Sequence, residues 1–245
     1  MEVHAHTHTA RKKWTHYLWE FLMLFLAVFC GFLAEYQLEH KIERDREEKY
    51  IQTFIEDLKT DTASINSNLL FLKSKKNQLD SLTGLLKERK IKGYENELYY
   101  LGRLLVRARR FQNNDRTITQ LKNSGALRLI RNEKAADSMI AYQKLVETIL
   151  TNIEDEHLER RDADPILAQM FNPFVFDKML DTTNKINKPT DNPALRSYDP
   201  SLQLDLAYRI HQLKGSNIIL ITRLQLLKQK ATNIISFLEE EYHLK

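Results

Sequence analysis

Histidine is the residue whose spacing most directly suggests metal chemistry in this chain. His4, His6 and His8 alternate in the opening residues MEVHAHTHT. Three imidazoles on one short segment can chelate nickel, copper or zinc. The alternative is a tail on which nothing packs and which therefore tolerates such residues. We keep the three histidines as candidate ligands and predict that the chain holds no cofactor.

Two Glu-x-x-His pairs form a second pattern that could bind metal. Glu154 precedes His157, and Glu240 precedes His243, at the spacing found in di-iron helical bundles. If four long helices alternate in direction, however, the third ends where the fourth begins. The two histidines then lie at opposite ends of the bundle, so we expect no di-metal site.

Basic side chains are concentrated between residues 103 and 134, where nine basic and two acidic residues give a net charge of +7. Such a region can bind anionic lipid headgroups or another polyanion, and its densest part is Arg103, Arg107, Arg109 and Arg110. The alternative is exposed ion pairing with the acidic start of the first long helix, worth about 0–1 kcal/mol per pair. That acidic set is Glu43, Asp45, Glu47, Glu48, Glu56, Asp57 and Asp61.

Catalytic motifs are absent from the sequence. It contains no glycine-rich phosphate loop, no Gly-x-Ser-x-Gly elbow and no zinc-protease motif. The single cysteine, Cys30, excludes an internal disulfide framework. The net charge of +4 gives no reason to expect nucleic acid as a partner. We predict a protein that is not an enzyme.

Composition indicates that helices must position these groups. Glycine and proline total eleven of 245 residues, far below the roughly 12% of average usage, and a β-rich fold needs many turns that use them. Apolar residues make up 42% of the chain, too many for a wholly disordered protein. We predict an all-α fold with one N-terminal transmembrane helix, a charged helical stalk and an elongated antiparallel four-helix bundle.

A basic, histidine-rich tail over residues 1–13 precedes the predicted membrane helix over residues 14–36. The uncharged run FLMLFLAVFCGFLA lies within that helix, which would be about 34 Å long, enough for a hydrocarbon core of about 30 Å. A cleaved signal peptide would place bulky Phe32 at the −3 position of a cut after Ala34, and Phe29 before Cys30 disfavours lipidation. We expect an uncleaved signal anchor.

Two features inside this helix could have a role beyond anchoring. Glu20 is an ionisable group within the span, which is by default a functional hypothesis, but pairing with His16 near the interface explains it more simply. Ala27 and Gly31 form a small-xxx-small pair, through which two membrane helices can approach closely. We predict helix association through these two residues.

The remaining residues are predicted to form the stalk, 37–50, and the helical domain, 51–245. In the domain, apolar residues recur every seven positions from Ile51 to Leu86 and from Leu206 to Ile234, which is typical of long packed helices. A second helix is predicted with apolar residues from Tyr94 to Ala108 on one face and a break at Asn113-Asn114-Asp115. A third long helix begins after Asn132 as its cap. All five prolines lie in a connector over 165–200.

The opening HTHTARKKWTHYLWEFLMLFLAVFCGFLAEYQLEHKIERDRE, followed by IEDLKTDTASI and TQLKNSGALRLIRNEKAADSMIAYQ, resembles an uncharacterised Bacteroidota family of single-span membrane proteins. Members share a basic start, one span, a charged stalk and a long helical domain. The resemblance is specific over residues 1–60 and looser over 115–142. It implies a bacterial setting and a membrane anchor, and it implies no catalytic residue.

Two functional hypotheses follow. The first is a membrane-anchored structural or interaction protein of the bacterial cell envelope, forming homo-oligomers or binding an envelope protein. It would be single-pass in the inner membrane. The count of lysine and arginine, three before the span and four just after it, does not decide the orientation. A short basic tail usually stays in the cytoplasm, so we expect a cytoplasmic N-terminus and a periplasmic C-terminal domain. The second is an extracytoplasmic small-ligand sensor or an accessory subunit of a membrane complex.

Overall fold

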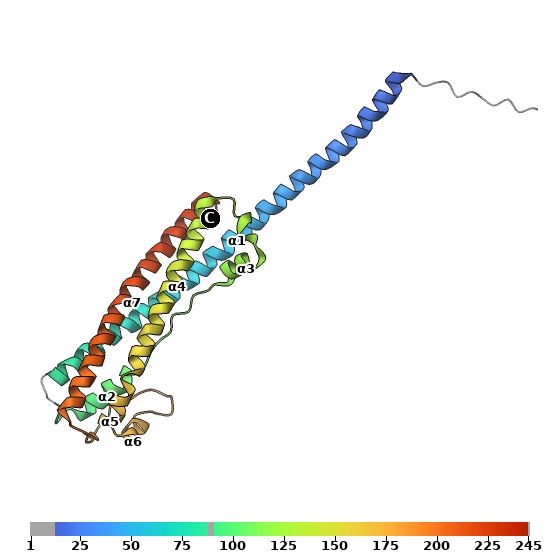
Figure 1. Cartoon of the computed structure of the whole chain (residues 1–245). Coiled ribbons are helices and arrows are strands. Elements are labelled where there is room, and N and C mark those ends of the chain that lie inside the picture. The colour runs from blue at the N-terminus through green and yellow to red at the C-terminus, as the bar shows by residue number, and fades with distance from the viewer. Residues whose placement is uncertain (1–12, 88–90, 245) are drawn as a thin grey trace, which may run out of the picture. The chain divides into compact units, whose positions relative to one another are not determined.

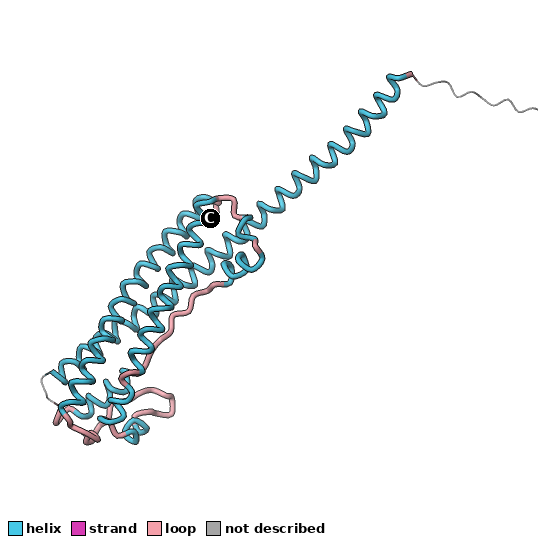
Figure 2. Tube along the Cα trace, in the orientation of Figure 1, coloured by secondary structure: helices cyan, strands magenta, loops and turns pink. Residues whose placement is uncertain are grey.

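The computed structural model describes residues 13–87 and 91–244 of the chain. In these ranges the fold is all-helical, and the only β pairing is an isolated bridge between Leu180 and Ile186. Figures 1 and 2 show the arrangement of the elements. They are α1 (Trp14–Lys87), α2 (Glu95–Leu105), α3 (Arg116–Ser124), the 3-10 turn η1 (Ala126–Leu129), α4 (Glu133–Arg161), α5 (Asp164–Met170), α6 (Pro173–Lys178) and α7 (Pro200–Glu241).

The chain divides into two units, Met1–Tyr50 and Ile51–Lys245. In the first unit, α1 carries the one helical stretch in the described residues that is long and apolar enough to cross a membrane. None of the residues in this apolar stretch is buried. The charged segment 37–50 is also helical and continues α1, as the sequence predicts.

Three long helices form the second unit: α1 from Ile51 onward, α4 and α7. Ion pairs between Lys59 and Glu239 (2.7 Å) and between Asp80 and Lys214 (2.5 Å) show that α7 runs antiparallel to α1. The phenol of Tyr142 on α4 donates a hydrogen bond to Asp61 on α1. Fourteen residues further along both helices, the charge of Glu156 acts on Lys75, so α4 runs parallel to α1.

The second helix of the predicted four-helix bundle is shorter in the structure than the sequence predicts. The sequence predicts a helix as far as Ala108, but α2 ends at Leu105, and residues 107–115 form no helix before α3 begins. Figure 2 shows this non-helical stretch running back along the long helices. The long helices α1 and α4 contact each other through Tyr142, which donates to Asp61 at 2.7 Å and packs against Phe54 with ring centroids 6.3 Å apart.

The apolar heptads line the core as predicted. On α1, Ile51, Leu58, Ile65, Leu79 and Leu86 are buried, although Leu72 is only half-buried. Each fully buried leucine or isoleucine contributes roughly 1.5–3 kcal/mol. All the predicted α7 positions are buried as well: Leu206, Leu213, Leu220, Leu224, Leu227, Ala231, Ile234 and Leu238.

Local signals set the helix ends, and the predicted cap Asn132 is confirmed. The side chain of Asn132 accepts a hydrogen bond from the Ala135 amide at 3.1 Å and begins α4, while Asp199 accepts from the Ser201 amide at 2.9 Å and begins α7. Gly125 adopts a φ of +65° directly after α3, the left-handed conformation that glycine favours at a helix end. Within the proline-rich connector, α5 and α6 are short helices.

Candidate functional site

The histidines and glutamates that could bind metal do not come together in the described residues. His4, His6 and His8 lie outside the described residues. His157 and Glu154 form an exposed pair at 3.4 Å, and His243 lies beyond the end of α7. Among the described residues, no group of three or more histidine, cysteine, aspartate or glutamate side chains could hold a metal ion.

The apolar part of α1 has two different faces. His16 Nε2 lies 3.0 Å from Glu20 Oε1, which confirms the predicted pairing. At 100° per residue, Glu20 shares a face with Ala27 and Gly31. The opposite face carries Phe21, Phe25 and Phe29, whose rings stack at centroid distances of 6.3 and 5.9 Å. Glu20 and the two small residues therefore share one face with Leu24, and the three stacked phenylalanines lie on the other.

The predicted basic patch lies mainly on the non-helical stretch. Arg107, Arg109 and Arg110 are exposed, and their guanidinium groups form no ion pair or hydrogen bond within the described part of the chain. Arg103 differs from them because it is half-buried on α2, with its guanidinium 5.8 Å from the centroid of the Phe176 ring. Arg103 is therefore a packing residue, and the exposed patch consists of the other three.

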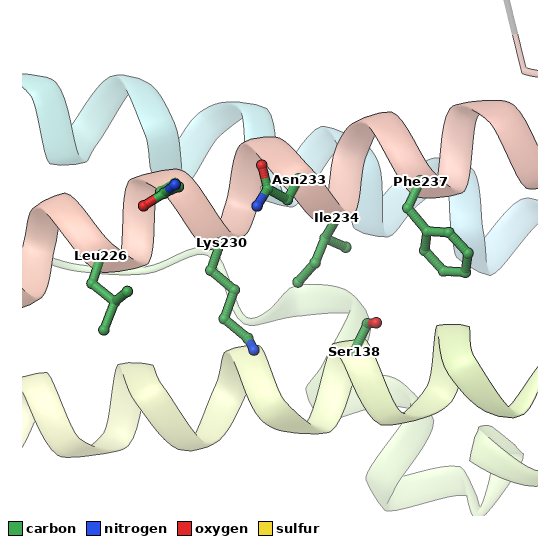
Figure 3. Close-up of a pocket in the computed structure, with 7 residues that line it drawn as sticks. Ser138, Leu226, Lys230, Asn233, Ile234 and Phe237 are labelled. Atoms are coloured by element: carbon green, nitrogen blue, oxygen red, sulfur yellow. The ribbon is translucent and has the colours of Figure 1, made fainter.

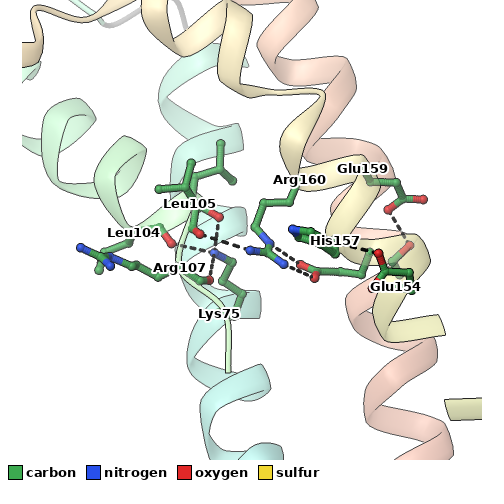
Figure 4. A network of polar contacts seen from close by, with 11 residues as sticks. Lys75, Leu104, Leu105, Arg107, Glu154, His157, Glu159 and Arg160 are labelled. Carbon is green, nitrogen blue, oxygen red and sulfur yellow. Dashed lines mark hydrogen bonds and ion pairs between the residues drawn. The ribbon is translucent and has the colours of Figure 1, made fainter. Parts of the chain in front are cut away.

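One end of the non-helical stretch is held by a buried lysine on α1. Only 5% of Lys75 is exposed, and its Nζ donates to the carbonyl oxygens of Leu104 (2.7 Å), Leu105 (2.6 Å) and Arg107 (3.0 Å), as Figure 4 shows. The last carbonyls of a helix lack intrahelical partners and carry partial negative charge, so an ammonium group stabilises them. Burial lowers the pKa of Lys75 to about 8.

An arginine on α4 strengthens the same end. Arg160 Nη1 donates to the carbonyl oxygen of Val106 at 3.3 Å. Both its Nε and its Nη2 donate to the carboxylate of Glu156, at 3.2 and 3.0 Å. Lys75 and Arg160 together satisfy the carbonyls at which α2 stops, which is the physical reason why the helix does not continue to Ala108.

The other end is held by two buried aspartates on α1. Asp57 accepts hydrogen bonds from the amide of Thr117 (2.9 Å) and the side chain of Asn114 (2.8 Å). Asp61 accepts from the amide of Asn114 (2.6 Å) and the phenol of Tyr142 (2.7 Å). Burial raises the pKa of Asp61, although these two hydrogen bonds oppose the shift. Asp57 thus acts as a cap for α3 supplied by another helix.

The predicted pairing with acidic residues of the first long helix does occur for Arg116. Its Nη2 lies 3.2 Å from Glu56 and 3.0 Å from Asp57. The pairing leaves Arg107, Arg109 and Arg110 exposed and unpaired within the described chain.

These two attachments hold the chain between them at both ends. From Asp61 to Lys75 the helix rises about 21 Å, so the seven residues from Arg107 to Asn114 span at most about 3 Å per residue between the side chains that hold them. A fully extended chain reaches roughly 3.3–3.6 Å per residue. The stretch 106–115, here called the extended segment, therefore runs along the long helices between its two attachments (Figure 2).

Lys75 and Arg160 were missed in the sequence, and Asp57 and Asp61 were predicted only as ion-pair partners, although a signal was present. Asp61, Asn68 and Lys75 stand seven residues apart and are all buried. They form a polar heptad beside the apolar heptad of α1. A polar residue repeated at inward-facing positions indicates that this face covers backbone groups instead of apolar side chains.

Two hollows in the described part of the helical domain are open grooves. One of about 430 Å³ lies between α4 and α7 and includes Ser138, Leu226, Lys230, Ile234 and Phe237 (Figure 3). Another, of about 340 Å³, lies along the connector beside Met179, Asn187 and Pro193. Neither surrounds a ligand-sized volume with converging polar groups, as small-molecule sites do.

Comparison with known proteins adds no relative: no family model, no curated protein and no solved structure matches this chain.

Proposed function

We propose that this chain is a membrane-anchored helical interaction protein of the bacterial cell envelope, without catalytic activity. One observation carries the proposal. The apolar stretch of α1 has no buried residue, whereas the unit 51–245 buries its own apolar side chains. A stretch this long and apolar favours a non-aqueous environment such as a membrane. The unit 1–50 would then anchor the chain in the membrane, and the unit 51–245 would be the domain that interacts with a partner.

The face of α1 that carries Ala27 and Gly31 is the proposed site of helix association. Small residues let two helix backbones approach closely, and ionisable residues in membrane helices face other helices and not lipid. Glu20 shares this face, which favours association there. The stacked phenylalanines would then face lipid. The partner is a second copy of the chain or another single envelope protein.

Crosslinking in native membranes tests this proposal. Gly31→Leu adds bulk to the small-residue face, where nothing lies within 4 Å of an added Cβ, so the substitution leaves the helix itself intact. We expect it to reduce crosslinked species strongly, and we expect Phe25→Leu on the opposite face to leave them unchanged. Only monomer in the wild-type protein, or recovery of the native chain from the aqueous fraction without detergent, would refute the proposal.

The orientation proposed is a cytoplasmic N-terminus and a periplasmic domain in the inner membrane. A reporter fused after Lys245 that is active only in the periplasm should be active, and a cytoplasmic reporter at the same position should be silent. We do not extend the proposal to small-ligand sensing, because the hollows described above are open grooves.

A further inference from the structure

We propose that residues 106–113 of the extended segment bind an acidic, extended segment of a partner protein, which lies alongside them as an added strand. This inference rests on the proposed function as an interaction protein, and it names the chemistry of one partner. Three features of the segment carry it: positive charge without an acidic partner, backbone amides that donate to no other described residue, and attachment to the helices at both ends.

The charge on the segment has no counterpart within the described chain. Arg107, Arg109 and Arg110 lie within four consecutive residues, and all three are exposed. The nearby acidic side chains are already engaged. Glu56 and Asp57 pair with Arg116, Asp61 accepts from Asn114 and Tyr142, and Glu156 pairs with Arg160. Three positive charges are thus left for an external carboxylate-rich ligand.

The backbone of the segment is also open to pairing. Within the described chain, no amide of residues 108–113 donates a hydrogen bond to another residue; residues 108–110 and 112 are exposed, whereas Phe111 is buried and is not available to a partner. A row of such groups on a chain fixed at both ends resembles the edge of a sheet, to which an extended peptide can add through main-chain hydrogen bonds. Every second side chain of the added strand would point toward the arginines, and acidic side chains at these positions would supply specificity.

The attachments at both ends prepare the segment for binding. Lys75 holds Arg107, and Asp61 holds Asn114, so the chain between them is fixed at both ends before any partner arrives. Ordering a flexible segment on binding costs free energy. Because the fold already orders this segment, binding a partner requires less of that free energy. An acidic protein segment uses both the charge and the backbone groups, whereas a lipid surface would use the charge alone. This difference favours a protein partner.

Fluorescence anisotropy with a labelled peptide tests the proposal on the full chain in neutral detergent. The probe is a peptide of about ten residues that alternates glutamate and threonine, and the control probe replaces glutamate with lysine. We expect salt-sensitive binding of the acidic probe and none of the basic one. The triple variant Arg107→Gln, Arg109→Gln, Arg110→Gln should bind at least about tenfold more weakly, which corresponds to 1.4 kcal/mol.

A matched variant separates local recognition from overall charge. Lys134, Lys144 and Arg161 are exposed on α4, and changing all three to glutamine removes the same charge. This control should bind like the wild type. Equal weakening of both variants, or no binding of the acidic probe by the wild type, would overturn the proposal.

Two further probes test the mode of binding. Methylating alternate amides of the acidic peptide blocks main-chain pairing and should weaken binding, and unchanged affinity would refute the added strand. Vesicles rich in phosphatidylglycerol should bind no better than neutral ones. Arginine-dependent binding to those vesicles would assign the segment to a membrane surface instead. The crosslinking test at Gly31 does not depend on peptide binding by the extended segment. A negative result in one experiment therefore refutes only the proposal that it tests.

Discussion

At Lys75 an ammonium group buried beneath α2 donates to three backbone carbonyl oxygens. A charge in this position would be costly without those acceptors, and the acceptors would lack partners without the charge. The lysine and the end of α2 therefore stabilise each other. Asp57 and α3 stabilise each other in the same way, because the carboxylate accepts a hydrogen bond from the Thr117 amide in the first turn of α3.

Lys75→Met should lower the free energy of unfolding by about 1–3 kcal/mol, because it leaves buried carbonyl groups without donors. Urea denaturation followed by circular dichroism measures this change. Lys73→Met, at an exposed neighbouring position on α1, is the control and should have little effect. Equal losses in the two variants would show that the carbonyl contacts contribute nothing.

The same residue predicts a pH dependence of stability. Its pKa is about 8 in the native state, against 10.5 for an ordinary lysine. Between these values the unfolded chain binds more protons than the native chain, so this group makes stability rise with pH from about 8 to 10.5. Lys75→Met should lose that rise, and denaturation at both ends of the interval tests it.

Among the elements, α2 is positioned by close packing as well as by its capped end. A Cβ built on Gly102 would lie 3.0 Å from the ring of Phe171, which is itself only 1% exposed. The Phe171 ring also packs against Tyr99, with ring centroids 5.1 Å apart. The ring therefore has little room to move, and α2 rests directly on the residue between α5 and α6.

Gly102→Ala should destabilise the domain by about 1–3 kcal/mol, because added bulk in a packed core forces neighbours to shift. Gly84 on α1 offers a matched control, since nothing lies within 4 Å of an added Cβ there. Gly84→Ala should instead stabilise by up to about 1 kcal/mol through helix propensity. Thermal unfolding measures both, and a shift of the same sign in the two variants would contradict this packing argument.

At the scale of the whole molecule, the two units differ in whether their apolar side chains are exposed or buried. The described residues of 1–50 include the exposed apolar stretch, whereas the buried apolar core belongs to residues 51–245. Folding of the second unit therefore does not depend on the first for apolar burial. Membrane association and folding should be separable properties of this chain.

Residues 51–245 produced alone should be helical, unfold cooperatively and remain in solution without detergent, while the full chain should require detergent. Circular dichroism and sedimentation measure both properties. An aggregated or unfolded 51–245 fragment would show that the first unit contributes to the fold itself.

Much of the helical structure was predictable because it depends on neighbours in sequence. The heptads from Ile51 to Leu86 and from Leu206 to Ile234 identify buried faces, since residues three and four apart share one side of a helix. Asn132 and Asp199 were recognisable as caps because their partners lie two or three residues away. The apolar stretch of α1 was evident from composition alone.

What covers each buried face was decided only by the tertiary structure. The stripe from Leu98 to Leu105 is equally compatible with a helix that continues to Ala108, and nothing local ends it. The end is set by Lys75, about thirty residues earlier, and by Arg160, more than fifty residues later. The exposure of Arg107, Arg109 and Arg110 follows from that ending. Periodicity reports that a face is buried, but the identity of its partner depends on distant contacts, which a local pattern does not contain.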